Sequence, residues 1–89
     1  MADESHRVMR LAESRLLVVL RVEGSLDSEL VALLEAESRA VLAANKWLGL
    51  DLSGVLSIDA QGLKFLKELA TQKVQLINPP WSIFAELHR

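Results

Sequence analysis

The chain has 89 residues, of which 51% are hydrophobic, and a formal net charge of −2. A chain of this length forms one small domain that buries only about 60–65% of its unfolded surface. Its ten basic and twelve acidic residues are interspersed, which argues against a nucleic-acid partner. It contains no cysteine, which excludes disulfides and thiolate metal sites and fits a cytoplasmic protein.

The N-terminal residues are polar and begin acidic, unlike a secretory signal. We expect residues 1–6 to be a mobile tail and residues 7–89 to form a single domain. Apolar runs such as Leu16–Leu20 are far too short to span a bilayer. We therefore expect a cytoplasmic protein without direct membrane insertion.

Two strands are predicted first. Val8–Leu11 has the mixed polarity of an edge strand, and Glu13–Arg15 is a spacer short enough for a hairpin. Leu16–Val22 is apolar at successive positions without alternation, which predicts a strand covered on both faces.

A helix is predicted from Glu29 to about Ala44, with Asp27 or Ser28 as its N-cap and Asn45 as its C-cap. The residues expected on its buried side are Leu30, Leu33, Leu34, Glu37, Val41 and Ala44.

Trp47–Leu52 is the third predicted strand, and residues 51–62 are predicted to be a loop with two carboxylates, two hydroxyls and two glycines. Gly54 is expected to serve turn geometry, and Gly62 a close approach of helix and sheet. A helix over residues 60–71 should bury Leu63, Leu66, Leu69 and Ala70. Sites in open α/β sheets tend to lie where a strand leads into a helix, so this loop is the candidate site.

Residues 73–77 predict a short strand, stopped by Asn78-Pro79-Pro80, and residues 81–87 a last short helix. The fold class is α/β: a mixed sheet of about four strands, with an opening antiparallel hairpin and the rest parallel, and helices packed against it. Trp47 and Trp81 are expected to be in the core or half-buried, with an interface anchor as the alternative for Trp81.

Two segments resemble a known family. Val22–Asp27 is similar to the "L-x-G-x-L-D" that ends the second strand of STAS domains, the fold of anti-sigma-factor antagonists. Leu48–Leu63 resembles the central block of that family, a hydrophobic strand followed by "D/N-L" and "I/M-D-S-x-G-L". The chain is shorter than a full STAS domain and is expected to lack the last strand and helix, which leaves the strand over residues 73–77 near an uncovered edge.

The resemblance implies a protein-binding module, often paired with an anti-sigma factor that is a serine kinase. That kinase switches the module off by phosphorylating the serine directly after the motif aspartate. Here the residue after Asp59 is Ala60, which has no hydroxyl and is not phosphorylatable. Ser53 and Ser57 do not match the acceptor position.

The expected partner-binding residues are Asp27, Ser57, Asp59, Ala60, Gln61 and Lys64. Asp59 has two readings that can both hold: a partner-facing charge, or an N-cap that accepts the N–H of Gln61 or Gly62. Asp51 is expected to stabilise a turn, and Asp51 with Asp59 lacks a third ligand for a metal. The sequence therefore predicts no enzyme, no metal and no cofactor.

Two other functions stay open. The chain could be a constitutive STAS subunit of a stressosome-like scaffold or of an ABC-transporter complex, or a small-ligand or nucleotide sensor using the helix N-terminus at residues 60–62. A homodimer is also open.

Overall fold

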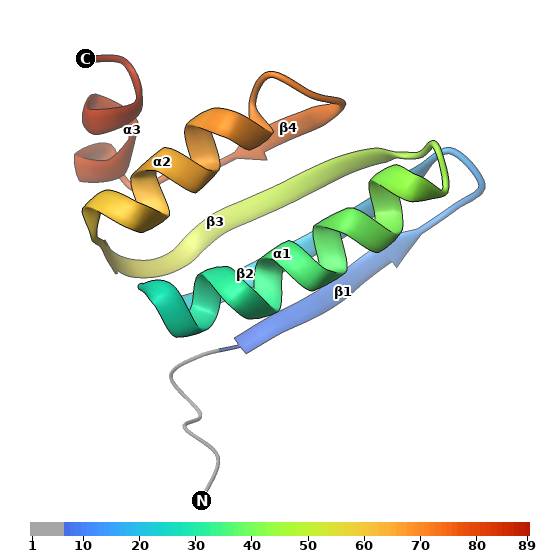
Figure 1. Ribbon diagram of the computed structural model, residues 1–89, viewed down its shortest axis with the longest axis horizontal. Helices are drawn as coiled ribbons and strands as arrows, with labels where there is room; N and C mark the ends of the chain where they lie inside the picture. Colours follow the sequence, from blue (N-terminus) through green and yellow to red (C-terminus); the bar gives the residue numbers. More distant parts are fainter. Residues whose placement is uncertain (1–6) are drawn as a thin grey trace, which may run out of the picture.

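A computed structural model describes residues 7–89, so the predicted tail over residues 1–6 lies outside the described part. The elements in chain order are β1 (Arg7–Glu13), β2 (Leu17–Leu26), α1 (Ser28–Ala43), β3 (Trp47–Ile58), α2 (Ala60–Leu69), β4 (Val74–Ile77) and α3 (Trp81–Leu87) (Figure 1). Every predicted strand and helix is present.

The four strands form one sheet in the order β1-β2-β3-β4. β1 is antiparallel to β2, and the other neighbours are parallel, which confirms the predicted mixed sheet. Both parallel connections move the chain in the same direction across the sheet. Because such crossovers are right-handed, α1 and α2 lie on the same side, where they contact each other (Figure 1).

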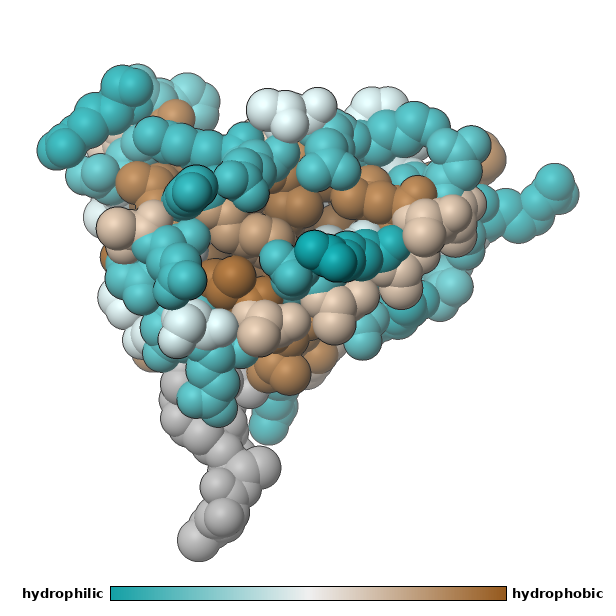
Figure 2. All heavy atoms as spheres, viewed as in Figure 1, coloured by the Kyte–Doolittle hydropathy of each residue, from teal (hydrophilic) through white to brown (hydrophobic). Residues whose placement is uncertain are grey.

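The core lies between this helix pair and the sheet. Figure 2 shows the helix side, where polar side chains surround apolar atoms. The buried hydrophobic residues are Val18, Leu20, Val22, Leu26, Leu30, Leu34, Val41, Leu48, Leu50, Leu52, Val55, Leu66, Leu69, Val74 and Ile83. Among the described residues, no helix is long and apolar enough to cross a membrane.

The prediction that β2 is covered on both faces is wrong. Its side chains alternate, with Val18, Leu20 and Val22 buried and Leu17 41% exposed. The reason is that both crossover connections are right-handed and run in the same direction across the sheet, so both helices cover the same face and the other face has no crossover helix. We name this side the open face; it carries Leu17, Val19 and Arg21 of β2, register partners of Trp47, Gly49 and Asp51 of β3.

The N-terminus of α1 is capped as the sequence predicts, whereas its C-cap is Ala44, one residue before the predicted Asn45. Asp27 accepts the backbone N–H groups of Glu29 and Leu30, both at 3.1 Å. At the other end Asn45 adopts a positive φ of 59°, and the N–H of Lys46 bonds to the carbonyl of Val41 at 3.3 Å. This is the Schellman arrangement, which asparagine tolerates better than most residues.

The buried side of α1 differs from the predicted one. Leu30, Leu34, Ser38 and Val41 are buried, whereas Leu33 is 49% exposed. Glu37 is only partly buried, and Ala44 is exposed at the C-cap. The buried stripe follows spacings of four and three residues, which brings Ser38 into the core and leaves Leu33 at its margin.

Two strands are longer than predicted. β2 continues to Leu26 and β3 to Ile58, so most of the expected loop over residues 51–62 is strand. Pairing persists through two irregularities in register, and a bulge lets paired strands continue past an extra residue. Gly54 therefore does not serve a turn; a Cβ there would lie 2.9 Å from Cγ of Glu23 on the neighbouring strand.

The C-terminal third also differs in detail. α2 ends at Leu69, and Ala70, expected in the core, is exposed at its C-cap. Trp47 is 52% exposed, in keeping with the prediction that it is half-buried, whereas Trp81 is 78% exposed, so the prediction that it lies in the core or half-buried is wrong. α3 buries Ile83 instead, because that residue faces the core while Trp81 starts the helix.

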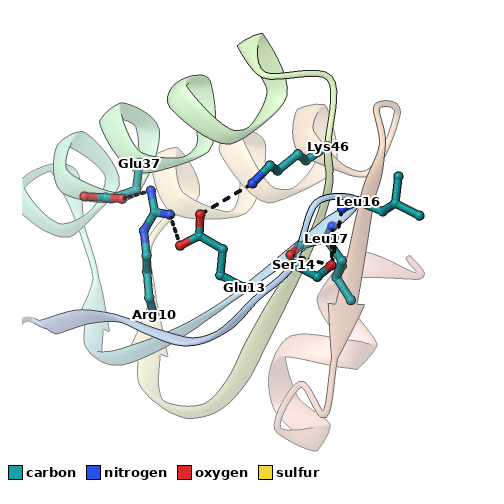
Figure 3. Close-up of polar contacts among 7 residues, drawn as sticks. All are labelled: Arg10, Glu13, Ser14, Leu16, Leu17, Glu37 and Lys46. Carbon is teal, nitrogen blue, oxygen red and sulfur yellow. Dashed lines mark hydrogen bonds and ion pairs between the residues drawn. The ribbon is translucent and has the colours of Figure 1, made fainter.

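The end of the molecule at the β1–β2 turn is joined to α1 by ion pairs (Figure 3). Arg10 bonds to Glu13 at 2.9 Å and reaches Glu37 on α1 at 3.4 Å. Lys46, just after α1, reaches Glu13 at 3.4 Å. Hydrogen bonds from Arg10 and then Lys46 hold the pKa of the Glu13 carboxyl below its ordinary value.

Candidate functional site

Two helices begin at the same edge of the sheet. Leu26 and Ile58 are register partners near the ends of the parallel strands β2 and β3. α1 starts two residues after Leu26, and α2 two residues after Ile58, so their N-termini lie at one end of the molecule (Figure 1). This is the carboxyl edge of the strands, where the sequence places the candidate site.

Each helix begins with an aspartate at its N-cap. Asp59 accepts the backbone N–H of Gly62 at 2.8 Å, as Asp27 does for the first turn of α1. The capping role expected for Asp59 is therefore confirmed, with Gly62 as the donor. Asp59 is also exposed, so its negative charge remains available to solvent at the start of α2.

Gly62 holds the first turn of α2 against the end of β2. A Cβ on this glycine would overlap the carbonyl oxygen of Leu26 and approach Cγ1 of Ile58 to 3.0 Å. The N–H of Asp59 also donates to the carbonyl of Leu26 at 3.4 Å. The predicted close approach of helix and sheet at Gly62 is confirmed.

Ser57 lies two residues before Asp59, near the end of β3, where it still pairs with β2. Its hydroxyl oxygen lies 2.9 Å from that of Ser25 on β2, its register partner. The pairing of these two hydroxyls was not predicted from the sequence, because the register that brings them together depends on pairing between distant segments. This bond ties the two strand ends together between the two caps.

Leu56 is the site residue that the sequence reasoning missed. It has no Cα partner on β2, because Val55 pairs with Gly24 and Ser57 pairs with Ser25. Bulged positions of this kind redirect a side chain, and Leu56 is 78% exposed while Val55 is buried. The sequence signal that could have pointed to Leu56 is the pair of adjacent apolar residues, Val55 and Leu56, inside a segment predicted to be a polar loop.

A hollow of about 520 Å³ lies where the end of β3, the start of α2 and α3 meet. It is lined by Leu56, Ser57, Ile58, Asp59, Ala60, Leu63, Ser82, Ile83 and Glu86. A second hollow of about 480 Å³ runs along α2 and shares Ala60 and Leu63 with the first. The contribution of α3 was not predicted, since it depends on how the C-terminal helix packs.

The structure brings together most of the residues selected from the sequence. Ser57, Asp59 and Ala60 line the first hollow, and Ala60 and Lys64 line the second. Gln61 is exposed on the first turn of α2 and lines neither. Asp27 lies at the start of the neighbouring helix. We name the set Asp27, Leu56, Ser57, Asp59, Ala60, Gln61 and Lys64 the docking surface.

Asp51 does not belong to this surface. It lies on the open face, where it accepts the N–H of Ser53 at 3.0 Å and bonds to Arg21 at 3.2 Å. The hydrogen bonds from Ser53, and then the Arg21 charge, lower the pKa of Asp51. Arg21 in turn bonds to Glu23 at 3.1 Å, which raises the pKa of its guanidinium. Asp51 stabilises backbone as expected, but within a strand and not a turn.

The chemistry of the docking surface suits recognition. Its carboxylates cap helices, and Ser57 bonds to another hydroxyl. Within residues 7–89, no group of three or more His, Cys, Asp or Glu side chains is placed to hold a metal ion. The docking surface exposes Leu56 to solvent, surrounded by charged and polar side chains. An apolar centre with a polar rim is the usual composition of a protein interface.

Comparison with known proteins identifies the fold. The family model described as "Mlab, STAS domain" matches residues 9–88. The chain belongs to the STAS family. This STAS domain is also similar to the solved structure of the anti-sigma factor antagonist SpoIIAA in its unphosphorylated form, at 19% sequence identity and a TM-score of 0.70, over 92% of this chain and 82% of SpoIIAA. No curated protein sequence matches significantly.

Proposed function

We propose that this STAS domain is a non-enzymatic, cytoplasmic protein-binding module of bacterial signalling, of the anti-sigma-factor-antagonist type, and that its partner binds the docking surface. The observation that carries the proposal is the exposure of Leu56, whose side chain is 78% exposed at a strand bulge. Leu56 lines the hollow beside the capped start of α2. The description of SpoIIAA as an anti-sigma factor antagonist supports the class of partner.

Burial of Leu56 by a partner supplies the affinity. An apolar centre surrounded by a polar rim is the usual composition of a protein interface. Full burial of one leucine is worth roughly 1.5–3 kcal/mol. The exposed charges of Asp59 and Lys64 around it favour partners with complementary charges and govern association more than final affinity.

Ala60 makes the proposed binding constitutive. Phosphorylation directly after Asp59 would add nearly two negative charges to this surface, but Ala60 offers no hydroxyl to carry a phosphate. Ser57 is turned toward Ser25 on the neighbouring strand. The protein would therefore stay in the binding-competent form.

A second candidate, a constitutive subunit of a stressosome-like scaffold or of an ABC-transporter complex, is favoured by the same alanine, because such a subunit needs no phosphoserine switch. A nucleotide sensor is disfavoured. The Asp59 carboxylate already occupies the N–H of Gly62, and its negative charge opposes a phosphate there.

Affinity capture from native lysate tests the proposal, with bound proteins identified by mass spectrometry. The baits are the wild type, Leu56→Glu on the docking surface and the control Leu33→Glu, whose leucine is 49% exposed on α1. A kinase-like anti-sigma factor captured by wild type and Leu33→Glu, but lost with Leu56→Glu, is the expected result. Capture of scaffold or transporter subunits would select the second candidate, and capture indifferent to Leu56→Glu would overturn the docking surface.

A further inference from the structure

A second apolar surface lies at the opposite end of the molecule, on the open face. It gathers where β2 and β3 begin: Leu16 is 75% exposed, Leu17 is 41% exposed and Trp47 is 52% exposed. Figure 3 shows Leu16 projecting from the β1–β2 turn away from α1. The turn is well defined, because Ser14 accepts the N–H groups of Leu16 and Leu17, both at 3.2 Å. The exposed leucines are therefore held in place.

A hollow of about 360 Å³ lies within this surface. Its lining contains no charged residue and consists of Leu16, Leu17, Val19, Trp47, Leu48, Gly49, Gln75 and Ile77. Gly49 forms its floor: a Cβ at this position would lie 3.1 Å from Cδ1 of Ile77 and 3.4 Å from Cγ2 of Val19. Ile77 and Val19 therefore flank the space that a Cβ on Gly49 would take, and Trp47, which is 52% exposed, stands on the rim of the hollow.

We propose that this surface binds a second copy of the chain in a two-fold dimer, with Trp47 of each copy seated in the hollow of the other. A two-fold interface uses the same patch on both subunits, so the patch must fit itself. An aromatic projection beside a recess meets this condition. Because the lining is uncharged, two identical copies meet here without like-charge repulsion.

The exposed area matches a small dimer interface. Given the surface of such side chains, the exposed parts of Leu16, Leu17 and Trp47, together with those of Val19, Gln75 and Ile77 in the same lining, amount to roughly 500 Å². Two copies would bury about 1,000 Å², the lower end of specific interfaces. Interfaces at this lower end are typical of weak, transient complexes. A small ligand fits less well, since ligand sites enclose most of their occupant, whereas this hollow is open to solvent.

Polar residues limit the surface toward the middle of the sheet. There Arg21 bonds to Glu23, Asp51 and Ser53 at 3.0–3.2 Å, so these groups satisfy one another and need no partner. The docking surface lies beyond them, at the other ends of β2 and β3. The dimer therefore leaves both docking surfaces free, and the inference does not depend on the proposed function.

Sedimentation equilibrium of the full chain, from micromolar to millimolar concentration, tests the dimer. Leu16→Glu places a charge within the proposed interface, and Leu56→Glu is the matched control, with 75% and 78% exposure respectively. Wild type and Leu56→Glu should dimerise alike, and the dissociation constant of Leu16→Glu should rise at least ten-fold. A wild type that stays monomeric, a dimer that survives Leu16→Glu, or one lost equally with Leu56→Glu would each overturn the proposal.

Fluorescence of Trp47 gives an independent readout on a chain without the interface mutation. In a Trp81→Phe background only Trp47 reports, because the chain has two tryptophans. Its emission should move to shorter wavelength as concentration rises, since dimerisation buries its exposed half. Emission that stays constant across a concentration range in which the dimer forms would place the interface elsewhere.

Discussion

The backbone of Gly62, in the first turn of α2, packs directly on the carbonyl of Leu26 at the end of β2, with no room for a Cβ between them. This contact holds the two helix N-termini of the docking surface at one edge of the sheet. It joins parts of the chain that are 36 residues apart, so the shape of the surface depends on long-range packing.

Gly62→Ala should destabilise the fold. The added methyl group must displace the carbonyl of Leu26, which belongs to the backbone and cannot rotate away. Overpacking of this kind costs about 1–3 kcal/mol, measured as the free energy of unfolding in urea. Gln61→Ala, one residue earlier and exposed, is the control and should change stability by less than about 0.5 kcal/mol. Equal stability of Gly62→Ala and wild type would mean that the contact is not tight.

The two roles of Asp59 can be separated by comparing two substitutions. Asp59→Ala removes the cap on the N–H of Gly62 and should lower the free energy of unfolding by about 1 kcal/mol. Asp59→Asn keeps a capping oxygen and removes the charge, so stability should be nearly unchanged while affinity for the captured partner falls. Isothermal calorimetry and urea unfolding measure the two effects. Unchanged affinity of Asp59→Asn would restrict Asp59 to capping.

Ser38 has a buried hydroxyl with no hydrogen-bond partner within residues 7–89, and the residue is 1% exposed. A buried hydroxyl without a partner costs about 1–3 kcal/mol, and alanine is the better helix former. Ser38→Ala should therefore raise the unfolding midpoint. A lower midpoint would show that the hydroxyl is satisfied by an ordered water in solution.

Asp51 should make stability fall in acid. Its pKa is lowered from the ordinary 3.8 by the hydrogen bonds from Ser53 and by Arg21, so the folded state binds its proton less readily than the unfolded state. Its contribution is present above the ordinary pKa and is lost as pH falls through the lowered value. Wild type should exceed Asp51→Asn in urea midpoint near neutral pH, and the difference should shrink below about pH 4. Glu13 titrates in the same window in both proteins, so the comparison isolates Asp51.

Ala60 predicts that a serine kinase of the anti-sigma class leaves the wild type unmodified. Intact mass spectrometry after treatment with ATP and kinase should show no added phosphate. Ala60→Ser restores a hydroxyl directly after Asp59 and should gain one phosphate from a kinase that recognises this surface. A stoichiometric phosphate on the wild type would contradict the proposal that the protein binds its partner constitutively. Ser57 and Ser53 would then be the candidate phosphate acceptors.

Local signals in the sequence were sufficient for the order and type of the elements and for both helix N-caps. The capping aspartates and Asn45 act through neighbouring residues, and the crossover hand follows from chirality. The length of β3 was not predictable in this way, because its bulge at Leu56 exists only in register with Gly24 and Ser25. The exposure of Leu33 and Trp81 likewise depends on how whole helices are rotated and packed.

The most direct test of the docking surface is an NMR titration of the ¹⁵N-labelled chain, which at 9.9 kDa suits the method, with the captured and purified partner. The account predicts that amide shifts cluster at residues 56–64 and around Asp27, and that the amides of residues 16–19 on the open face remain in place. Shifts concentrated on the open face or on the outer side of α1, with residues 56–64 unchanged, would contradict it.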